Sequence, residues 1–298
     1  MIAPRPGPLV TPGGAYWAQR AALAESGARL RALHGAVGRG SDLTLPQWAQ
    51  LLAVTLEFGP DLVIELGRGY GNSTCVFAEA FHRLGAADRW LLSVCRSDDW
   101  QRTTRAAVAP LVPAGWLDPI DARVNEILSF DFAAALGAAR RPMLFWDAHG
   151  MDVAECVLGE IVPLMATKDH LVAMHDLSDA RRSPPEAAAT GGTASGGRTT
   201  GTGPGSSLGH IQSAVEQAVA IVDLATRNGL TVESADRSIA EEIVAEPARV
   251  AEMQARLGDL FAPRAHWFWF TCAERAGEMT FPRFTHPKTR EAALAGAA

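Results

Sequence analysis

Short apolar runs alternate along the chain with longer segments of helical periodicity. Runs of strand length occupy Leu62–Leu66, Trp90–Cys95, Ile120–Val124, Met143–Trp146 and His170–Met174. The helical patterns between them cover Asn72–Leu84, Asp99–Leu111, Phe130–Ala139 and Met151–Met165. Strands that are apolar throughout and separated by helices are typical of a parallel sheet covered on both faces. The pattern therefore predicts an α/β fold.

Further elements are predicted on both sides of this series. Before it, Tyr16–Val37 and Leu45–Phe58 have helical periodicity, and Thr44 and Pro46 suit the start of the second helix. After it come helical patterns at His210–Asn228 and Ile239–Leu260 and strand-like runs at Thr231–Asp236 and His266–Cys272. We divide the chain into an N-terminal arm and helical cap (1–58), a sheet domain (59–281) and a C-terminal tail (282–298).

One segment departs from both patterns. Fifteen of the 18 residues from Thr190 to Ser207 are Gly, Ser or Thr, and the only charge is Arg198. Such a composition buries too little apolar surface to offset its ordering entropy, so we predict a flexible insertion over 184–209. It follows the fifth strand, where ligands bind in open α/β sheets. A tolerated insertion and a lid over a ligand both remain open.

The first strand runs into a glycine-rich loop. Leu62–Leu66 is followed by Gly67, Gly69 and Gly71, and then by a helical pattern. Glycines between a strand and a helix let a ligand approach the backbone. Dinucleotide sites carry G-x-G-x-x-G, whereas this spacing is G-x-G-x-G behind Glu65.

This form resembles motif I of the class I S-adenosylmethionine (SAM) methyltransferases. The resemblance implies a Rossmann-like, seven-stranded, mostly parallel sheet that closes with an antiparallel hairpin. It also implies that Glu65 faces the methionine ammonium group of SAM, and that Gly67, Gly69, Gly71 and Ser73 line the cofactor.

In the same family an acidic residue at the end of the second strand binds the ribose hydroxyls. Here Asp98 and Asp99 lie slightly beyond that position, and Asp98 is our candidate, although Cys95 or Ser97 could hold the expected place. Alternatively, Asp98 is only the N-cap of the next helix.

Polar residues also follow the fourth and fifth strands. Asp147 and His149 come after one, and His175 and Asp176 after the other. This pair of clusters resembles the metal-dependent O-methyltransferases of the catechol, macrolide-sugar and cephalosporin-hydroxylase-like groups. The resemblance implies Asp147, His175 and Asp176 as ligands of Mg²⁺ or another divalent metal. His149 is our candidate general base beside Asp147, with packing in the loop as the alternative.

Composition excludes several functions. A formal net charge of -6 without a basic stripe argues against nucleic acid as a partner.

No apolar run has membrane-spanning length, and no signal-peptide pattern opens the chain, so we expect a cytoplasmic protein. The four cysteines lack C-x-x-C spacing and are expected as buried free thiols. The aromatic run Trp267–Phe270 fits a buried strand whose second face contacts a helix or another copy of the chain, which leaves a homo-oligomer open.

The sequence therefore predicts a SAM-dependent O-methyltransferase that acts on a small hydroxylated molecule, such as a secondary metabolite or its sugar, in natural product biosynthesis. Two alternatives stay open. One is a metal-dependent, hydroxylase-like relative on the same fold, and the other is a non-catalytic partner protein with the SAM fold.

Overall fold

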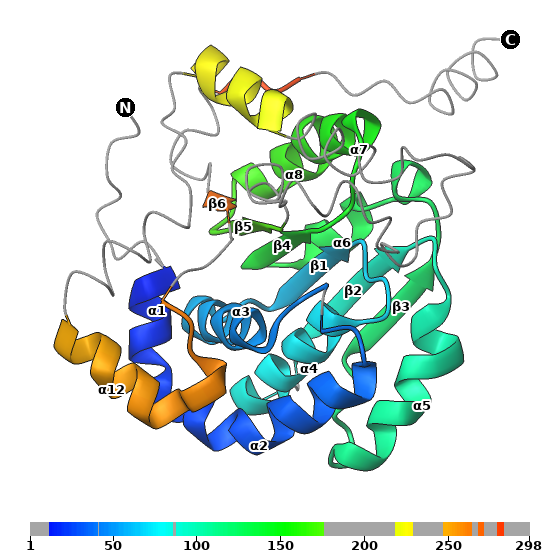
Figure 1. Cartoon of the computed structure of the whole chain (residues 1–298). Helices are drawn as coiled ribbons and strands as arrows, with labels where there is room; N and C mark the ends of the chain where they lie inside the picture. Colours follow the sequence, from blue (N-terminus) through cyan, green and yellow to red (C-terminus); the bar gives the residue numbers. More distant parts are fainter. Residues whose placement is uncertain are drawn as a thin grey trace, which may run out of the picture.

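The computed structural model describes residues 12–40, 42–85, 88–175, 218–228, 247–263, 268–270 and 279–282. These residues form a single six-stranded sheet in the order β3-β2-β1-β4-β5-β6 (Figure 1). The strands are β1 (Leu62–Leu66), β2 (Trp90–Cys95), β3 (Ile120–Val124), β4 (Pro142–Trp146), β5 (Leu171–Met174) and β6 (Phe268–Phe270). The first five are parallel to their neighbours, and β6 pairs antiparallel with β5.

The predicted α/β, Rossmann-like class is confirmed. The five predicted parallel strands are all present, and β6 is the core of the predicted last strand, with the antiparallel direction that the methyltransferase resemblance implied. The seventh strand, predicted at Thr231–Asp236, lies outside the described residues, as do the 184–209 insertion and the 283–298 part of the tail.

The helices follow the predicted order with local departures. The α-helices are α1 (Pro12–Ala18), α2 (Arg20–Val37), α3 (Leu45–Phe58), α4 (Asn72–Leu84), α5 (Arg105–Val108), α6 (Ala133–Ala138), α7 (Met151–Cys156), α8 (Val162–Ala166) and α12 (Pro247–Leu257). π-helical turns η2 (Trp100–Thr104) and η5 (Val157–Ile161) and 3₁₀ turns η3 (Ala109–Leu111), η4 (Ile127–Ser129) and η7 (Gly258–Leu260) extend or connect them. Residues 218–228 are also helical. Within these residues, no helix has the length and apolarity needed to cross a bilayer.

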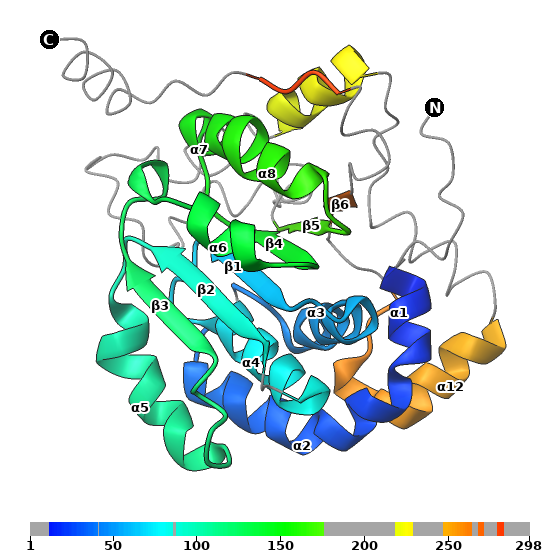
Figure 2. The same ribbon diagram turned by 180° about the vertical axis from the view of Figure 1, so that it is seen from behind.

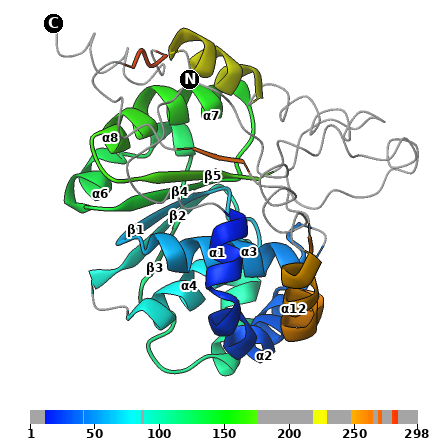
Figure 3. The same cartoon turned by 90° about the vertical axis from the view of Figure 1, so that its left-hand side faces the viewer.

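Two hydrophobic cores lie on opposite faces of the sheet. Successive strand residues alternate between them, because side chains of a strand point to opposite faces: Val63 belongs to one core and Leu62 and Ile64 to the other. The first core contains α1 to α4 and α12, and the second contains α6, α7, α8 and residues 218–228. Figures 2 and 3 show these two layers on either side of the strands.

The predicted N-terminal helices are present and share their core with the sheet. Trp48 on α3 and Leu23 and Leu30 on α2 are fully buried in the core that contains Val63 of β1. α12 joins this layer from the far end of the chain, since Arg20 pairs with Glu252 at 2.8 Å and the Tyr16 hydroxyl donates to the Leu260 carbonyl. The domain boundary at residue 58 stays a prediction.

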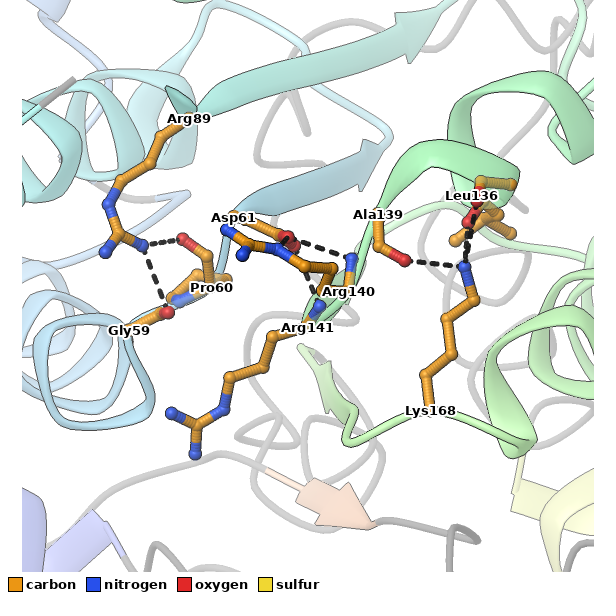
Figure 4. Close-up of polar contacts among 10 residues, drawn as sticks. Gly59, Pro60, Asp61, Arg89, Leu136, Ala139, Arg140, Arg141 and Lys168 are labelled. Carbon is orange, nitrogen blue, oxygen red and sulfur yellow. Dashed lines mark hydrogen bonds and ion pairs between the residues drawn. The ribbon is translucent and has the colours of Figure 1, made fainter. Parts of the chain in front are cut away.

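Separate groups of polar contacts lie at the amino ends of the central strands (Figure 4). The Asp61 carboxylate accepts the backbone N–H groups of Arg140 at 2.8 Å and Arg141 at 2.9 Å, and so links the start of β1 to that of β4. Arg89 donates to the Gly59 carbonyl at the end of α3, and Lys168 to the Ala139 carbonyl after α6. Cations at these helix ends satisfy carbonyls that lack a partner within the helix.

The contacts of Asp61 make the free energy of unfolding depend on pH. Burial raises the pKa of Asp61, but the N–H donors of Arg141 and Arg140 and the Arg140 guanidinium lower it by more, so the net pKa lies below its ordinary value. A carboxyl whose pKa is lower in the folded state stabilises the fold above its unfolded pKa, near 4, and loses this effect as the pH falls through its folded pKa. We expect Asp61→Asn to lower the free energy of unfolding by about 2 kcal/mol at pH 7.

Urea denaturation at pH 7 and at about pH 3.5 measures this effect, and the gap between Asp61→Asn and wild type should narrow at the lower pH. Asp223→Asn is the matched control, because Asp223 makes an exposed pair with Arg227 four residues later. Such a pair contributes only about 0.5 kcal/mol. A gap for Asp61→Asn that is independent of pH would contradict the assignment.

Candidate functional site

The site lies where the strand order reverses. From β1 the chain moves to β2 and β3 on one side, and then returns to β4 on the other side of β1. The carboxyl ends of β1 and β4 are joined there, because the Asp147 N–H donates to the Leu66 carbonyl at 2.9 Å. The His175 N–H donates to the Trp146 carbonyl at 3.2 Å and brings in the end of β5. Ligands of open α/β sheets bind at such a reversal.

Two of the three loop glycines, Gly67 and Gly71, pack closely against neighbouring residues, whereas the space beside Gly69 is open. Gly67, Gly69 and Gly71 have φ values of 93°, 50° and 96°. A Cβ atom on Gly67 would lie 2.5 Å from the Asp147 carbonyl oxygen, and one on Gly71 would lie 2.4 Å from the Trp100 ring. A Cβ atom on Gly69 would meet nothing within 4 Å. The loop therefore offers its backbone to a ligand at Gly69.

Glu65 anchors this loop to the sheet. Its side chain is fully buried, and its carboxylate accepts hydrogen bonds from Ser73 at 2.5 Å, Thr74 at 2.7 Å and Ser93. Ser73 and Thr74 belong to the first turn of α4, while Ser93 faces Glu65 in the register of β1 with β2. A buried carboxylate requires such donors. The predicted contact of Glu65 with an ammonium group stays a prediction.

Arg68 is a functional candidate that the sequence reasoning missed. Its side chain is buried, and its guanidinium donates to the Ser93 hydroxyl and carbonyl, both at 2.9 Å, and to the Ser97 carbonyl at 3.2 Å. The Ser93 hydroxyl thus connects the Arg68 cation to the Glu65 anion. Arg68 Nε has no hydrogen-bond partner in the described part of the chain. In the sequence, the position of Arg68 between Gly67 and Gly69 was the one sign of a role at the loop.

The end of β2 holds no carboxylate in this network. Asp98 is exposed and pairs with Arg102 at 3.5 Å, and its carbonyl accepts the Arg102 N–H, as expected for a residue at a helix start. The Asp99 carboxylate accepts a hydrogen bond from the Ser97 hydroxyl at 2.5 Å, and the Ser97 hydroxyl oxygen accepts the Asp99 N–H. The N-cap of η2 is Asp99 rather than Asp98, and the ribose role of Asp98 stays a prediction.

Asp147 and His175 form a hydrogen-bonded pair. Asp147 Oδ1 lies 3.2 Å from His175 Nδ1, and the His175 side chain is 7% exposed. On the other side, His175 Nε2 lies 3.2 Å from Gln47 Nε2. Gln47 belongs to α3, so this contact joins the N-terminal helices to the ends of β4 and β5.

The hydrogen bonds of Gln47 determine the tautomer of His175. Gln47 Oε1 accepts the Thr44 N–H at 2.8 Å in the capping box of α3, which leaves the NH₂ group to face His175. An amide NH₂ only donates, so His175 Nε2 must accept and the proton is on Nδ1, where it is donated to Asp147. His175 Nε2 is therefore the unprotonated ring nitrogen, and its lone pair accepts the hydrogen bond from Gln47.

The predicted metal site is only partly described. Asp147 and His175 are together, but Asp176 lies outside the described residues, and no cluster of three or more metal-ligating side chains occurs in the rest. Both ring nitrogens of His175 already have protein partners. His149 is half-buried, two residues after Asp147, and its predicted role as a base stays a prediction.

Three of the four cysteines are described, and all three are free. Cys75 and Cys156 are buried, while Cys95 is half-buried, so burial holds for two of them. Burial, and then the Glu65 carboxylate, raise the pKa of Cys75, and burial and Glu160 raise the pKa of Cys156 to about 12. Thiols of this kind are unreactive at neutral pH.

No protein-family model and no curated protein matches this chain. Among solved structures, a candidate O-methyltransferase from Klebsiella pneumoniae is 14% identical, with 69% of this chain and 81% of the other covered and a TM-score of 0.42. The O-methyltransferase TomG from Streptomyces achromogenes, involved in tomaymycin synthesis and solved with SAM, is 15% identical, with coverage of 68% and 81% and a TM-score of 0.42. Similarity at this level carries no functional argument.

Gly67 and Gly69 should respond differently to substitution by alanine. Gly67→Ala adds a Cβ atom against backbone and should cost more than about 3 kcal/mol of stability, whereas Gly69→Ala costs only the left-handed conformation, about 1 kcal/mol. If a ligand approaches the backbone at Gly69, the Gly69→Ala protein should stay folded and bind that ligand more weakly. Thermal denaturation and ligand titration of both variants check this. Equal destabilisation by the two substitutions would contradict the loop geometry.

Proposed function

We propose that the protein is a SAM-dependent methyltransferase that transfers a methyl group to a hydroxyl of a small molecule. The observation that carries this proposal is the glycine loop, which is fixed at the reversal point of the sheet by Glu65 and is open at Gly69. Cofactors with a nucleoside bind at this place in doubly wound folds.

The described residues fit SAM at the loop. The backbone from Gly67 to Gly71 would hold the methionine part of the cofactor, and the first turn of α4 would position it through Ser73. A G-x-G-x-G loop suits a cofactor without a pyrophosphate, since the third glycine of a dinucleotide loop is replaced by Asn72. When bound, SAM supplies an electrophilic methyl group on its sulfonium, so the protein has to align the acceptor and remove a proton.

The Asp147–His175 pair suits the proton removal. Asp147 would hold the ring in one orientation and stabilise the imidazolium that forms, while His175 Nε2 accepts the proton of the acceptor hydroxyl. Gln47 now donates to that nitrogen from the position that an acceptor O–H would take. Binding of the acceptor would therefore displace the Gln47 amide. Asp147 and His175 lie at the ends of adjacent strands, beside the loop that would hold the cofactor.

A divalent metal is a second use of the same pair. Asp147, His175 and Asp176 contain the oxygen and nitrogen donors that Mg²⁺, Mn²⁺ or Fe²⁺ accept. Ligation through His175 would need the Gln47 contact, or the Asp147 contact, to break. We therefore propose that the main role of His175 is proton transfer. We also propose that Mg²⁺ assists the reaction, and a chelator such as EDTA tests this second role. The proposed setting is a cytoplasmic pathway that modifies a hydroxylated secondary metabolite or its sugar.

Titration calorimetry with S-adenosylhomocysteine tests the cofactor. We expect a Kd in the micromolar range, that is, about -8 kcal/mol. The titration is repeated in EDTA and in Mg²⁺. Equal affinities in the two buffers would show that cofactor binding does not depend on the metal. If neither condition gives binding, the methyltransferase proposal fails. The metal-dependent hydroxylase and the non-catalytic partner protein would then be the remaining functions.

Matched histidine variants test the base. We expect His175→Ala to lower kcat by about 10²- to 10⁴-fold without weakening cofactor binding, because general-base catalysis contributes that much. His149→Ala is the control and should keep kcat within a few-fold. Once an acceptor has been found, methyl transfer from labelled SAM measures both variants. The opposite ranking would assign the base to His149, as the sequence predicted.

A further inference from the structure

The segment between α2 and α3 brings a cation onto the glycine loop. Arg39 lies in this connector, and its guanidinium carbon is 4.0 Å from the centroid of the Tyr70 ring. Tyr70 stands between Gly69 and Gly71, next to the open side of the loop. Both side chains are half-buried. The cation therefore lies against the ring of the residue that joins Gly69 to Gly71.

The connector is fixed in this position. Asn72 Nδ2 donates to the Arg39 carbonyl at 3.2 Å, and Asn72 Oδ1 accepts from Trp48 Nε1 at 3.1 Å. The Trp48 side chain is fully buried in α3. Asn72, the residue that replaces the third glycine of a dinucleotide motif, thus holds the connector against α4. Arg39 is preorganised at the loop, which lowers the entropy cost of using it for binding.

Within the described residues, the Arg39 guanidinium stacks on the Tyr70 ring and makes no ion pair. Arg20 shows the alternative: it lies 4.0 Å from the Trp17 ring and also pairs with Glu252 at 2.8 Å. Contact through the flat face of a guanidinium leaves its N–H groups available, and these match a carboxylate in a bidentate geometry. Arg20 on Trp17 thus has a carboxylate partner in Glu252, whereas Arg39 on Tyr70 has none among the described residues.

We propose that Arg39, stacked on Tyr70, is a cofactor-binding residue that holds the carboxylate of the amino-acid part of the cofactor. This inference rests on the proposed function, because it requires SAM at the glycine loop. The α-carboxylate is the only anionic group of SAM, and it is at the end that the loop would hold. The guanidinium would face the carboxylate, and its contact with the Tyr70 ring would set its orientation.

Two ligands separate this role from a structural one. S-adenosylhomocysteine carries the carboxylate, whereas 5′-methylthioadenosine has the same nucleoside and thioether but lacks the amino-acid end. We expect Arg39→Ala to weaken S-adenosylhomocysteine by about 10- to 100-fold, the range for a hydrogen-bonded charge pair, and to change the affinity for 5′-methylthioadenosine by less than about 2-fold. Arg39→Lys should fall between, because it keeps the charge and loses the bidentate geometry.

Arg20→Ala is the matched control, since it removes a stacked arginine far from the loop, and it should leave both affinities unchanged. Thermal denaturation of each variant monitors folding. Equal weakening of both ligands by Arg39→Ala, or no weakening of either, would overturn the carboxylate subsite while leaving the methyltransferase proposal intact. If the wild type binds neither ligand, the proposed function fails, and the subsite fails with it.

Discussion

The site depends on the buried carboxylate of Glu65. A charge with no exposure to water is stable only when its oxygens accept hydrogen bonds, and the Ser73, Thr74 and Ser93 hydroxyls supply these from α4 and β2. The three donors therefore fix the start of α4 relative to the ends of β1 and β2. Through Ser93 the network reaches Arg68, whose positive charge compensates the buried negative charge.

The glycine loop follows from this constraint and from a second one, the close approach of β4. Gly67 packs so near the Asp147 carbonyl that no Cβ atom fits, which brings Asp147 beside the loop. His175 then approaches Asp147 from the adjacent strand, and Gln47 reaches it from the capping box of α3. The glycine loop and the Asp147–His175 pair are thus joined by backbone contacts.

The helical layer contributes to the site as well as to the core. Trp48 and Asn72 connect α3 and the α2–α3 connector to the glycine loop, and Arg39 is placed by that connection. The same layer is closed by α12, which pairs with α2 through Arg20 and Glu252. Residues far apart in the sequence therefore support one end of the sheet.

The sequence by itself determined the parallel strands, the boundaries of α3 and α4 and the glycine loop, because apolar periodicity, capping residues and glycine spacing are local signals. It also placed Asp147 and His175 at the ends of the fourth and fifth strands. Only the tertiary structure decided their partners. The contacts of Arg68, Gln47 and Arg39 join residues that are 25 to 128 positions apart in the sequence, and no local pattern encodes such contacts.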